Sequence, residues 1–339
     1  MVRPAGGGDG IVTTTAQRRK CAADPREGCA VTTNLIEPGE LGRHRADPDW
    51  AIIDCRFELA RPDWGEQAFA AAHIPNALYA HLDRDLSGPR TALTGRHPLP
   101  EVGALAATFG RWGIDDRVQV VAYDQGGAVA FAARLWWLLR WLGHGKVAVL
   151  DGGLAAWERA GLPLDSVTTA RAPRRFRAAP AADAVVTSAA LERLVACGAL
   201  ERGEQLLVDA RGADRFAGEN ETLDPVAGHV PGARNHPFAM NLDARGRFLD
   251  AAALERRWTE RLRGRGAAEV IAMCGSGVTA CHNLLALEVA GLPGARLYAG
   301  SWSEWIRDPA RPVARGPEAP AGAGAEAQAA VATPNTRTS

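Results

Sequence analysis

The residues with the clearest capacity for chemistry lie together between positions 270 and 282. An apolar run of strand length, Val270–Met273, leads into Cys274, and a glycine-rich loop and a helical stretch follow it. In an open α/β sheet the carboxyl ends of strands bind ligands, and amides at a helix N-terminus favour negative charge. Gly275 and Gly277 allow the backbone to approach the sulfur closely. The pattern predicts a nucleophilic Cys274 thiolate that is held by backbone amides.

The alternative is that Cys274 is a small buried packing residue, as free cysteines often are. That interpretation leaves the glycines and the start of the helix without a purpose. Cys281 falls inside the predicted helix and is expected to pack there. The other four cysteines receive no role: Cys21, Cys29, Cys55 and Cys197. Six cysteines are too few for a disulfide scaffold and none forms a C-x-x-C pair, which favours a reduced, cytoplasmic protein.

Composition excludes several classes of protein. The 339 residues hold 39 basic and 39 acidic side chains, so the net charge is zero, which argues against a nucleic-acid-binding protein. Neither of the two lysines, Lys20 and Lys146, lies in a G-x-x-x-x-G-K-[ST] loop, so a P-loop NTPase is excluded. No charge-free apolar stretch could span a membrane, and no signal peptide is expected. The histidines lack metal-site spacing, so neither a metal nor an organic cofactor is expected.

The elements that must position Cys274 occur in two similar halves. Four landmarks appear twice in the same order, at offsets of 155, 156, 150 and 148 residues. They are Asp54 and Asp209, His73 and His229, Val120 and Val270, and Trp157 and Trp305. This repeat predicts two homologous domains, at 34–165 and 183–312, with a linker at 166–182.

Each half alternates short apolar runs with helical stretches, a pattern typical of an α/β fold. We therefore expect a parallel sheet flanked by helices in each domain. The two ends, 1–33 and 313–339, contain no aromatic residue and are low in complexity. They are predicted to be disordered, because they could bury too little apolar area to offset chain entropy.

The loop Cys274-Gly275-Ser276-Gly277-Val278-Thr279-Ala280 resembles the active-site loop of the rhodanese superfamily, in its tandem-domain 3-mercaptopyruvate or thiosulfate sulfurtransferase form. The resemblance covers roughly residues 34–310. Its further motifs are Asp54-Cys55-Arg56, Asp209-Ala210-Arg211, His73-Ile74-Pro75, His229-Val230-Pro231-Gly232-Ala233 and the closing segments that end at Trp157 and Trp305. It implies two rhodanese-like domains of which only the second is catalytic, because Asp124 occupies the position of Cys274 in the first.

The resemblance implies sulfur transfer. Cys274 would take the outer sulfur of a small donor as a persulfide and pass it to a thiophilic acceptor, such as cyanide or a protein thiol like that of thioredoxin. The amides of the loop would solvate both sulfur species, and the donor-binding loop residues are Gly275, Gly277, Val278 and Thr279. Family members that favour thiosulfate tend to have basic residues where this chain has Gly275 and Ser276. The expected donor is therefore 3-mercaptopyruvate, with thiosulfate as the alternative.

Donor recognition is expected at Arg215, which matches the family arginine that holds the mercaptopyruvate carboxylate. A guanidinium group can pair bidentately with a carboxylate. The family's second substrate arginine has no match in the segment 219–224, so looser binding of the donor is expected.

The resemblance also implies a proton relay from Asp83 and His97 of the first domain to Ser276, the catalytic loop serine. A histidine can move a proton near neutral pH. His97 could equally be a loop residue that bonds to backbone. His73 and His229 are expected to hold turns before proline.

Two other functions compete with this one. A dual-specificity phosphatase shares the fold but needs an arginine six positions after its cysteine, where this chain has Ala280. A persulfide carrier or redox-sensing module that docks to a partner also needs Cys274. Turnover of small donors would separate it from an enzyme, because a carrier would load once and stall.

Overall fold

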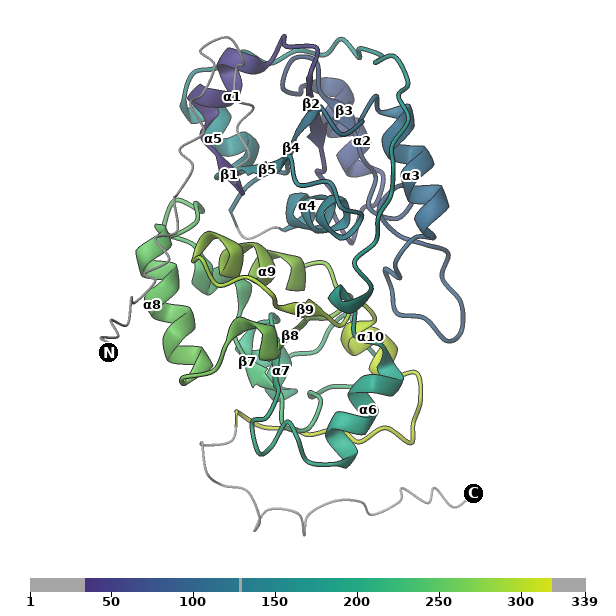
Figure 1. Ribbon diagram of the computed structural model, residues 1–339, viewed down its shortest axis with the longest axis vertical. Helices are drawn as coiled ribbons and strands as arrows, with labels where there is room; N and C mark the ends of the chain where they lie inside the picture. The colour runs from purple at the N-terminus through teal and green to yellow at the C-terminus, as the bar shows by residue number, and fades with distance from the viewer. Residues whose placement is uncertain (1–33, 128–129, 319–339) are drawn as a thin grey trace, which may run out of the picture. The chain divides into compact units, whose positions relative to one another are not determined.

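The computed structural model describes residues 34–127 and 130–318, which form two parallel sheets with helices against them (Figure 1). The first sheet has the strand order β1-β5-β4-β2-β3. Its strands are β1 (Leu35–Ile36), β2 (Trp50–Asp54), β3 (Leu78–Tyr79), β4 (Gln119–Tyr123) and β5 (Val147–Leu150). Around it lie α1 (Pro38–His44), α2 (Trp64–Ala71), α3 (Val102–Arg111), α4 (Phe131–Trp141) and α5 (Gly153–Arg159).

The second sheet has the order β7-β6-β8-β9 and repeats this plan. Its strands are β6 (Leu206–Asp209), β7 (Arg234–Asn235), β8 (Val270–Met273) and β9 (Arg296–Leu297). The helices are α6 (Ser188–Ala196), α7 (Ala213–Ala217), α8 (Ala251–Leu262), α9 (Ala280–Val289) and α10 (Ser301–Trp305). Short 3-10 turns lie at η1 (Ala182–Ala184), η2 (Phe238–Asn241) and η3 (Ala267–Glu269). The predicted α/β fold with parallel sheets is confirmed.

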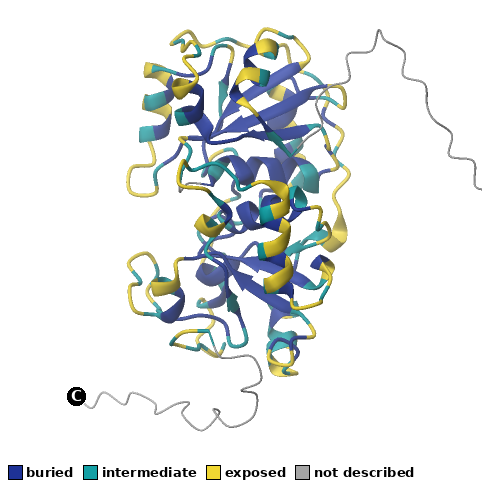
Figure 2. Cartoon of the chain, turned by 90° about the vertical axis from the view of Figure 1, so that its left-hand side faces the viewer, coloured by how far each residue is buried: buried dark blue, intermediate teal, exposed yellow. Residues whose placement is uncertain are grey.

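The central strands are apolar without alternation because both faces of each sheet are covered. All five residues of β4 and all four of β8 are buried, and Figure 2 shows the sheets in the buried colour with exposed residues on the outer helices and loops. In the described part of the chain, no helix combines the length and the apolar character needed to cross a membrane.

Helices α4 and α9 pack against each other and join the two halves (Figure 1). A helix that is apolar on all sides must be covered on all sides, and eight consecutive residues of each helix are buried, from Ala132 to Leu139 and from Ala280 to Leu287. One apolar cluster contains residues of both helices, among them Leu135 and Leu284. The end of β8 therefore lies next to residues of the first half.

The segment predicted as a linker, 166–182, is attached to the first half along its length. Arg171 donates to the carbonyl of Trp50 at 2.7 Å, and the Ala179 amide donates to the Leu142 carbonyl at 2.9 Å. Phe176 packs edge-on against Phe109, with ring centroids 5.2 Å apart. These contacts fix the path of the chain between the two sheets.

The predicted disordered end, 313–339, needs a correction for its first six residues. Ala314 exchanges two backbone hydrogen bonds with His229, both 2.9 Å long, and the Gly316 amide donates to the Ala217 carbonyl. Glu318 accepts from Arg261 at 2.8 Å and from the Asn235 amide at 3.0 Å. Backbone pairing and ion pairs hold this segment although it buries little apolar area. The rest of that end, and all of 1–33, lie outside the described residues.

Candidate active site

Cys274 directly follows β8, and its side chain is buried at the centre of a tight loop. The Gly277 amide donates to Cys274 Sγ at 3.1 Å. The Cys274 amide donates to Ser301 Oγ at 3.0 Å, and the carbonyls of Cys274 and Gly275 accept from the amides of α10. The loop is thus fixed from both sides, and a backbone N–H group points at the sulfur.

Gly277 holds this arrangement because its φ of 78° lies in the left-handed region. A Cβ at this position would also collide with the carbonyl oxygen of Ala299. Thr279 follows as the N-cap of α9, so the helix begins directly after the loop, as the sequence predicts. Among the described residues, the Gly277 amide is the group that donates to the Cys274 sulfur.

Ser276 and His97 meet across the two halves of the molecule. His97 Nδ1 lies 2.7 Å from Ser276 Oγ, and His97 Nε2 lies 3.4 Å from Asp83 Oδ1. The second contact is an ion-pair distance without hydrogen-bond alignment, since Nε2 has no hydrogen-bond partner among the described residues. The carboxylate beside Nε2 favours a proton on that nitrogen, which leaves Nδ1 to accept from the Ser276 hydroxyl.

The surroundings of His97 and Asp83 lower the pKa of both side chains. Burial lowers the pKa of His97 below its usual value, although the Asp83 carboxylate opposes the shift. The nearby His97 ring, at 3.4 Å, lowers the pKa of Asp83, although burial opposes the shift. At neutral pH the pair is therefore a neutral imidazole beside a carboxylate, a state suited to taking up a proton.

Arg134, which sequence reasoning did not single out, ties this pair to the cysteine loop. It lies on α4, fully buried, and donates to the Gly277 carbonyl at 3.2 Å and to the His97 carbonyl at 3.3 Å. One guanidinium group therefore sets the distance between the two backbone segments that carry Ser276 and His97. The sequence alone gives no signal for it, because an arginine in an apolar helix pattern has no visible partner.

Arg215 projects from α7 toward the loop but is braced by acidic side chains. Glu221 receives hydrogen bonds from Arg215 Nε at 3.2 Å and from Nη2 at 2.8 Å, and Asp224 lies 3.3 Å from Nη2. Burial opposes ionisation of Glu221, but its hydrogen bonds with Arg215 and nearby amides lower its pKa. Neighbouring Arg211 pairs with Asp209 at 2.7 Å and belongs to the buried frame.

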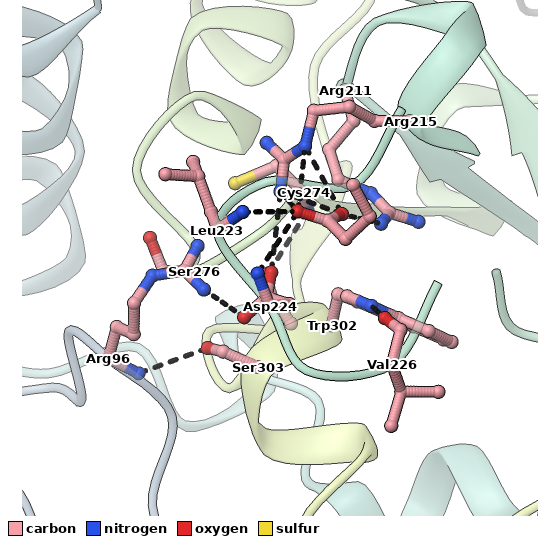
Figure 3. A network of polar contacts seen from close by, with 12 residues as sticks. Arg96, Arg211, Arg215, Leu223, Asp224, Val226, Cys274, Ser276, Trp302 and Ser303 are labelled. Carbon is pink, nitrogen blue, oxygen red and sulfur yellow. Dashed lines mark hydrogen bonds and ion pairs between the residues drawn. The ribbon is translucent and has the colours of Figure 1, made fainter. Parts of the chain in front are cut away.

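Arg96 is a second residue that the sequence analysis missed. It comes from the first half, directly before His97, and forms an ion pair with Asp224 (Figure 3). Its backbone amide donates to Ser303 Oγ at 3.0 Å. No signal in the sequence links position 96 to position 215, because only folding brings them together.

A cavity of about 400 Å³ is lined by Cys274 together with residues of both halves of the molecule. Its polar wall contains Arg96, His97 and Arg215, and its apolar wall contains Phe57, Phe131 and Phe238. Of the predicted loop residues, Gly275, Ser276, Val278 and Thr279 line it, whereas Gly277 supports the sulfur and Asp83 stands behind His97. No cluster of three or more potential metal ligands occurs among the described residues.

A family model described as the rhodanese-like domain matches the chain twice, over residues 37–160 and 196–308. The chain belongs to the rhodanese family. The first match covers the first sheet except β1, the second covers the whole second sheet, and the cysteine loop lies in the second match. The expectation of a two-domain rhodanese sulfurtransferase, drawn from the sequence, is confirmed at the level of the family and of the class of enzyme.

Relatives and solved structures of the rhodanese family cover most of this chain. A "Probable 3-mercaptopyruvate sulfurtransferase" of Pseudomonas aeruginosa is 48% identical over 84% of this chain and 99% of its own. A "Putative thiosulfate sulfurtransferase SseB" of Mycobacterium tuberculosis is 41% identical over 83% of this chain and 97% of its own. The crystal structure of SseA from Escherichia coli, described as a 3-mercaptopyruvate sulfotransferase with the rhodanese fold, matches with a TM-score of 0.68 and 32% identity, over 80% of this chain and all of that one.

Proposed function

We propose that this rhodanese takes sulfur from 3-mercaptopyruvate and passes it to a thiophilic acceptor through a persulfide on Cys274. The observation that carries the proposal is a single cavity lined by Cys274, Ser276, His97 and two arginines. A nucleophile, a proton relay and an anion-binding wall are the parts that this reaction needs.

The proposed first half-reaction balances without an oxidant. The Cys274 thiolate attacks the sulfur of 3-mercaptopyruvate, and the carbon–sulfur bond breaks. Its electron pair leaves with the three-carbon fragment as the pyruvate enolate, while a sulfur–sulfur bond forms at Cys274. The proton that the donor's thiol group gives up is the proton that the enolate carbon gains. In the second half-reaction an acceptor thiol or cyanide attacks the outer sulfur, and Cys274 leaves as a thiolate.

Ser276, His97 and Asp83 are proposed to move that proton. Ser276 Oγ lies 2.7 Å from His97 Nδ1, and both residues line the cavity. A neutral His97, favoured by its burial, can take up a proton through Ser276 and return it to the enolate. The Asp83 carboxylate stabilises the imidazolium that exists between the two transfers.

The donor preference rests on charge. Gly275 and Ser276 bring no cation next to the sulfur, and Glu221 and Asp224 neutralise the nearby arginines. A monoanionic keto acid suits such a wall better than dianionic thiosulfate does. The names of the two relatives differ on this point, since one is called a 3-mercaptopyruvate and the other a thiosulfate sulfurtransferase.

The acceptor is proposed to be a thiol such as that of thioredoxin, with cyanide as a laboratory substitute. The cavity has room beyond a three-carbon donor, which supports approach of a second group to the outer sulfur. The division into a silent domain at 34–165, a linker and a catalytic domain at 183–312, with a cytoplasmic site of action, belongs to the same proposal.

Steady-state turnover with 3-mercaptopyruvate and with thiosulfate, each with cyanide or dithiothreitol, tests this function. We expect turnover with both donors and a higher kcat/KM for 3-mercaptopyruvate. Mass spectrometry of donor-treated protein should place one added sulfur on Cys274. A single loading without turnover would identify a persulfide carrier, and sulfur on Cys281 or Cys55 would overturn the assignment of the nucleophile.

A further inference from the structure

Two arginines from different halves of the molecule converge on the residue next to the nucleophile. A Cβ added to Gly275 would lie 2.8 Å from Arg96 Nη2, 3.6 Å from Arg215 Nη2 and 3.7 Å from Arg215 Nη1. Both side chains line the cavity over Cys274. Their charged ends therefore meet at one place, which is next to the sulfur.

Asp224 holds these two side chains in position. One of its carboxylate oxygens pairs with Arg96 Nη1 and the other lies 3.3 Å from Arg215 Nη2 (Figure 3). Its side chain is only 3% exposed, so this bridge is not an incidental surface contact. A buried carboxylate between two guanidinium groups fixes their separation and orientation.

The brace leaves one amino group of each arginine unused. Arg96 Nη2 and Arg215 Nη1 have no hydrogen-bond partner in the described part of the chain, whereas Arg96 Nη1 and Arg215 Nη2 are occupied by Asp224 and Glu221. Guanidinium N–H groups without a protein partner can donate hydrogen bonds to a bound anion, and a carboxylate has two oxygens to accept them.

We propose that Arg96 of the first domain and Arg215 of the second together form the carboxylate-binding subsite for the sulfur donor, with Asp224 as the residue that positions both. This inference rests on the proposed function. It assigns to the first domain the donor-binding cation that the segment 219–224 lacks in the sequence. The carboxylate of the donor lies between the two free amino groups, and its sulfur then points toward Cys274.

The proposal predicts a specific loss when Arg96 is replaced. Kinetics are measured with 3-mercaptopyruvate and with its amide, 3-mercapto-2-oxopropanamide, which carries the same sulfur but no charge. In Arg96→Gln we expect kcat/KM for the acid to fall about 10- to 100-fold, mainly through KM, because a charged hydrogen-bonding partner is lost. The amide should change less than about threefold. Arg84→Gln is the matched control, since Arg84 pairs with Glu66 on the surface of the same domain.

A second variant displaces the Arg96 side chain without replacing that residue. Gly275 does not have a positive φ, so Gly275→Ala is tolerated by the backbone, and its new methyl group displaces the end of Arg96. The ratio of acid to amide efficiency should fall in this variant as well, by less than in Arg96→Gln. An unchanged ratio in both variants, or an equal loss for acid and amide, would overturn the proposal and leave Arg96 as an interdomain contact only.

A binding measurement separates this inference from the proposed function. Titration calorimetry with 3-hydroxypyruvate, which has the carboxylate but no sulfur to transfer, gives a dissociation constant without chemistry. We expect about 10-fold weaker binding in Arg96→Gln than in the wild type. If the wild type forms no persulfide from 3-mercaptopyruvate, the proposed function fails, but a loss of hydroxypyruvate binding in Arg96→Gln would still support the subsite. Equal binding in both proteins would overturn it.

Discussion

The loops after β4 and β8 share one local contact, from a glycine amide to the side chain that directly follows the strand, but they carry different chemistry. In the second domain the Gly277 amide donates to Cys274 Sγ at 3.1 Å, and in the first the Gly126 amide donates to Asp124 Oδ1 at 3.0 Å. A Cβ on Gly277 would collide with the carbonyl oxygen of Ala299, two residues after β9, and a Cβ on Gly126 would collide with that of Gly152, two residues after β5. Both domains therefore direct a glycine amide at this side chain, and the residue at the position decides the chemistry.

The surroundings of the two loops differ as well. Phe69 stacks on His73 in the first domain, and Phe216 stacks on His229 in the second. In each pair the phenylalanine carbonyl accepts from Nδ1 of the histidine, so Phe69 and Phe216 are equivalent. The residue before Phe216 is Arg215, whereas the residue before Phe69 is Ala68. Burial raises the pKa of the Asp124 carboxyl, and amide hydrogen bonds oppose the shift. The first domain thus has neither a cysteine at the position of Cys274 nor an arginine at the position of Arg215.

The largest expected effect distinguishes the two loops directly. Cys274→Ser should abolish sulfur transfer and leave the fold intact, because a hydroxyl group is a poor sulfur nucleophile. Asp124→Ala should keep turnover within a few-fold of the wild type. Turnover and circular dichroism of both variants give the answer. A large loss of turnover in a folded Asp124→Ala protein would mean that the first loop takes part in the chemistry.

The contribution of the first domain is tested next at His97. His97→Asn should lower kcat with 3-mercaptopyruvate by about 100- to 1,000-fold, the usual range for a lost general acid or base. Turnover of thiosulfate should be nearly unchanged, since sulfite leaves without protonation of a carbon atom. Because burial lowers the pKa of His97, the pH at which kcat falls on the acid side should lie below about 6.5, the pKa of a free histidine. Equal losses with both donors would contradict the relay.

The arginine without a counterpart in the first domain gives a smaller effect. Arg215→Gln should cost about 1.5–3 kcal/mol of transition-state stabilisation with 3-mercaptopyruvate, measured as kcat/KM. Arg307→Gln, at an exposed position on the same domain, should change it little. An unaffected KM in Arg215→Gln would remove this residue from the donor subsite.

A charge change at Asp224 should shift the preference between donors. The buried cluster pairs Arg96, Arg211 and Arg215 with Asp209, Glu221 and Asp224, so Asp224→Asn adds one net positive charge. We expect the thiosulfate-to-mercaptopyruvate ratio of kcat/KM to rise about three- to tenfold, because a dianion gains more from that charge than a monoanion. A ratio that falls or stays constant would contradict the role of charge in donor selection.

The last prediction concerns stability rather than turnover. His236 and Ala80 occupy equivalent positions in the two domains. The His236 amide donates to the carbonyl of Asp209 at the end of β6, and the Ala80 amide donates to the carbonyl of Asp54 at the end of β2. Burial lowers the pKa of His236 to about 4. The unfolded chain therefore binds more protons below about pH 6.5, and stability present above that pH is lost as pH falls toward 4.

This linkage amounts to about 2 kcal/mol between pH 7 and pH 5. Urea denaturation at the two pH values measures it. His236→Gln should show a smaller drop in the denaturation midpoint than the wild type, whereas His44→Gln, at a position where the side chain is 34% exposed, should show the full drop. A pH dependence in His236→Gln that matches the wild type would assign the effect to other groups.

Local pattern was sufficient to predict the fold class and to single out Cys274 and its loop. Apolar runs of four or five residues marked β4 and β8, and the glycines after Cys274 marked the loop, because strand burial and left-handed backbone are encoded by the residues themselves. Ser276, His97 and Asp83 were named only through the family resemblance, and the structure places His97 against Ser276. The end of the second domain was misjudged, since Glu318 is held by ion pairs rather than by apolar contacts.

The sequence by itself determined that two related α/β halves exist and that only the second presents a cysteine at the end of a buried strand. Which residues surround that cysteine was decided by the tertiary structure. The packing of α4 against α9 brings Arg96, His97 and Arg134 of the first domain to within hydrogen-bond distance of groups in the second. Such contacts join positions more than 140 residues apart, and single side chains carry no local mark of a distant partner.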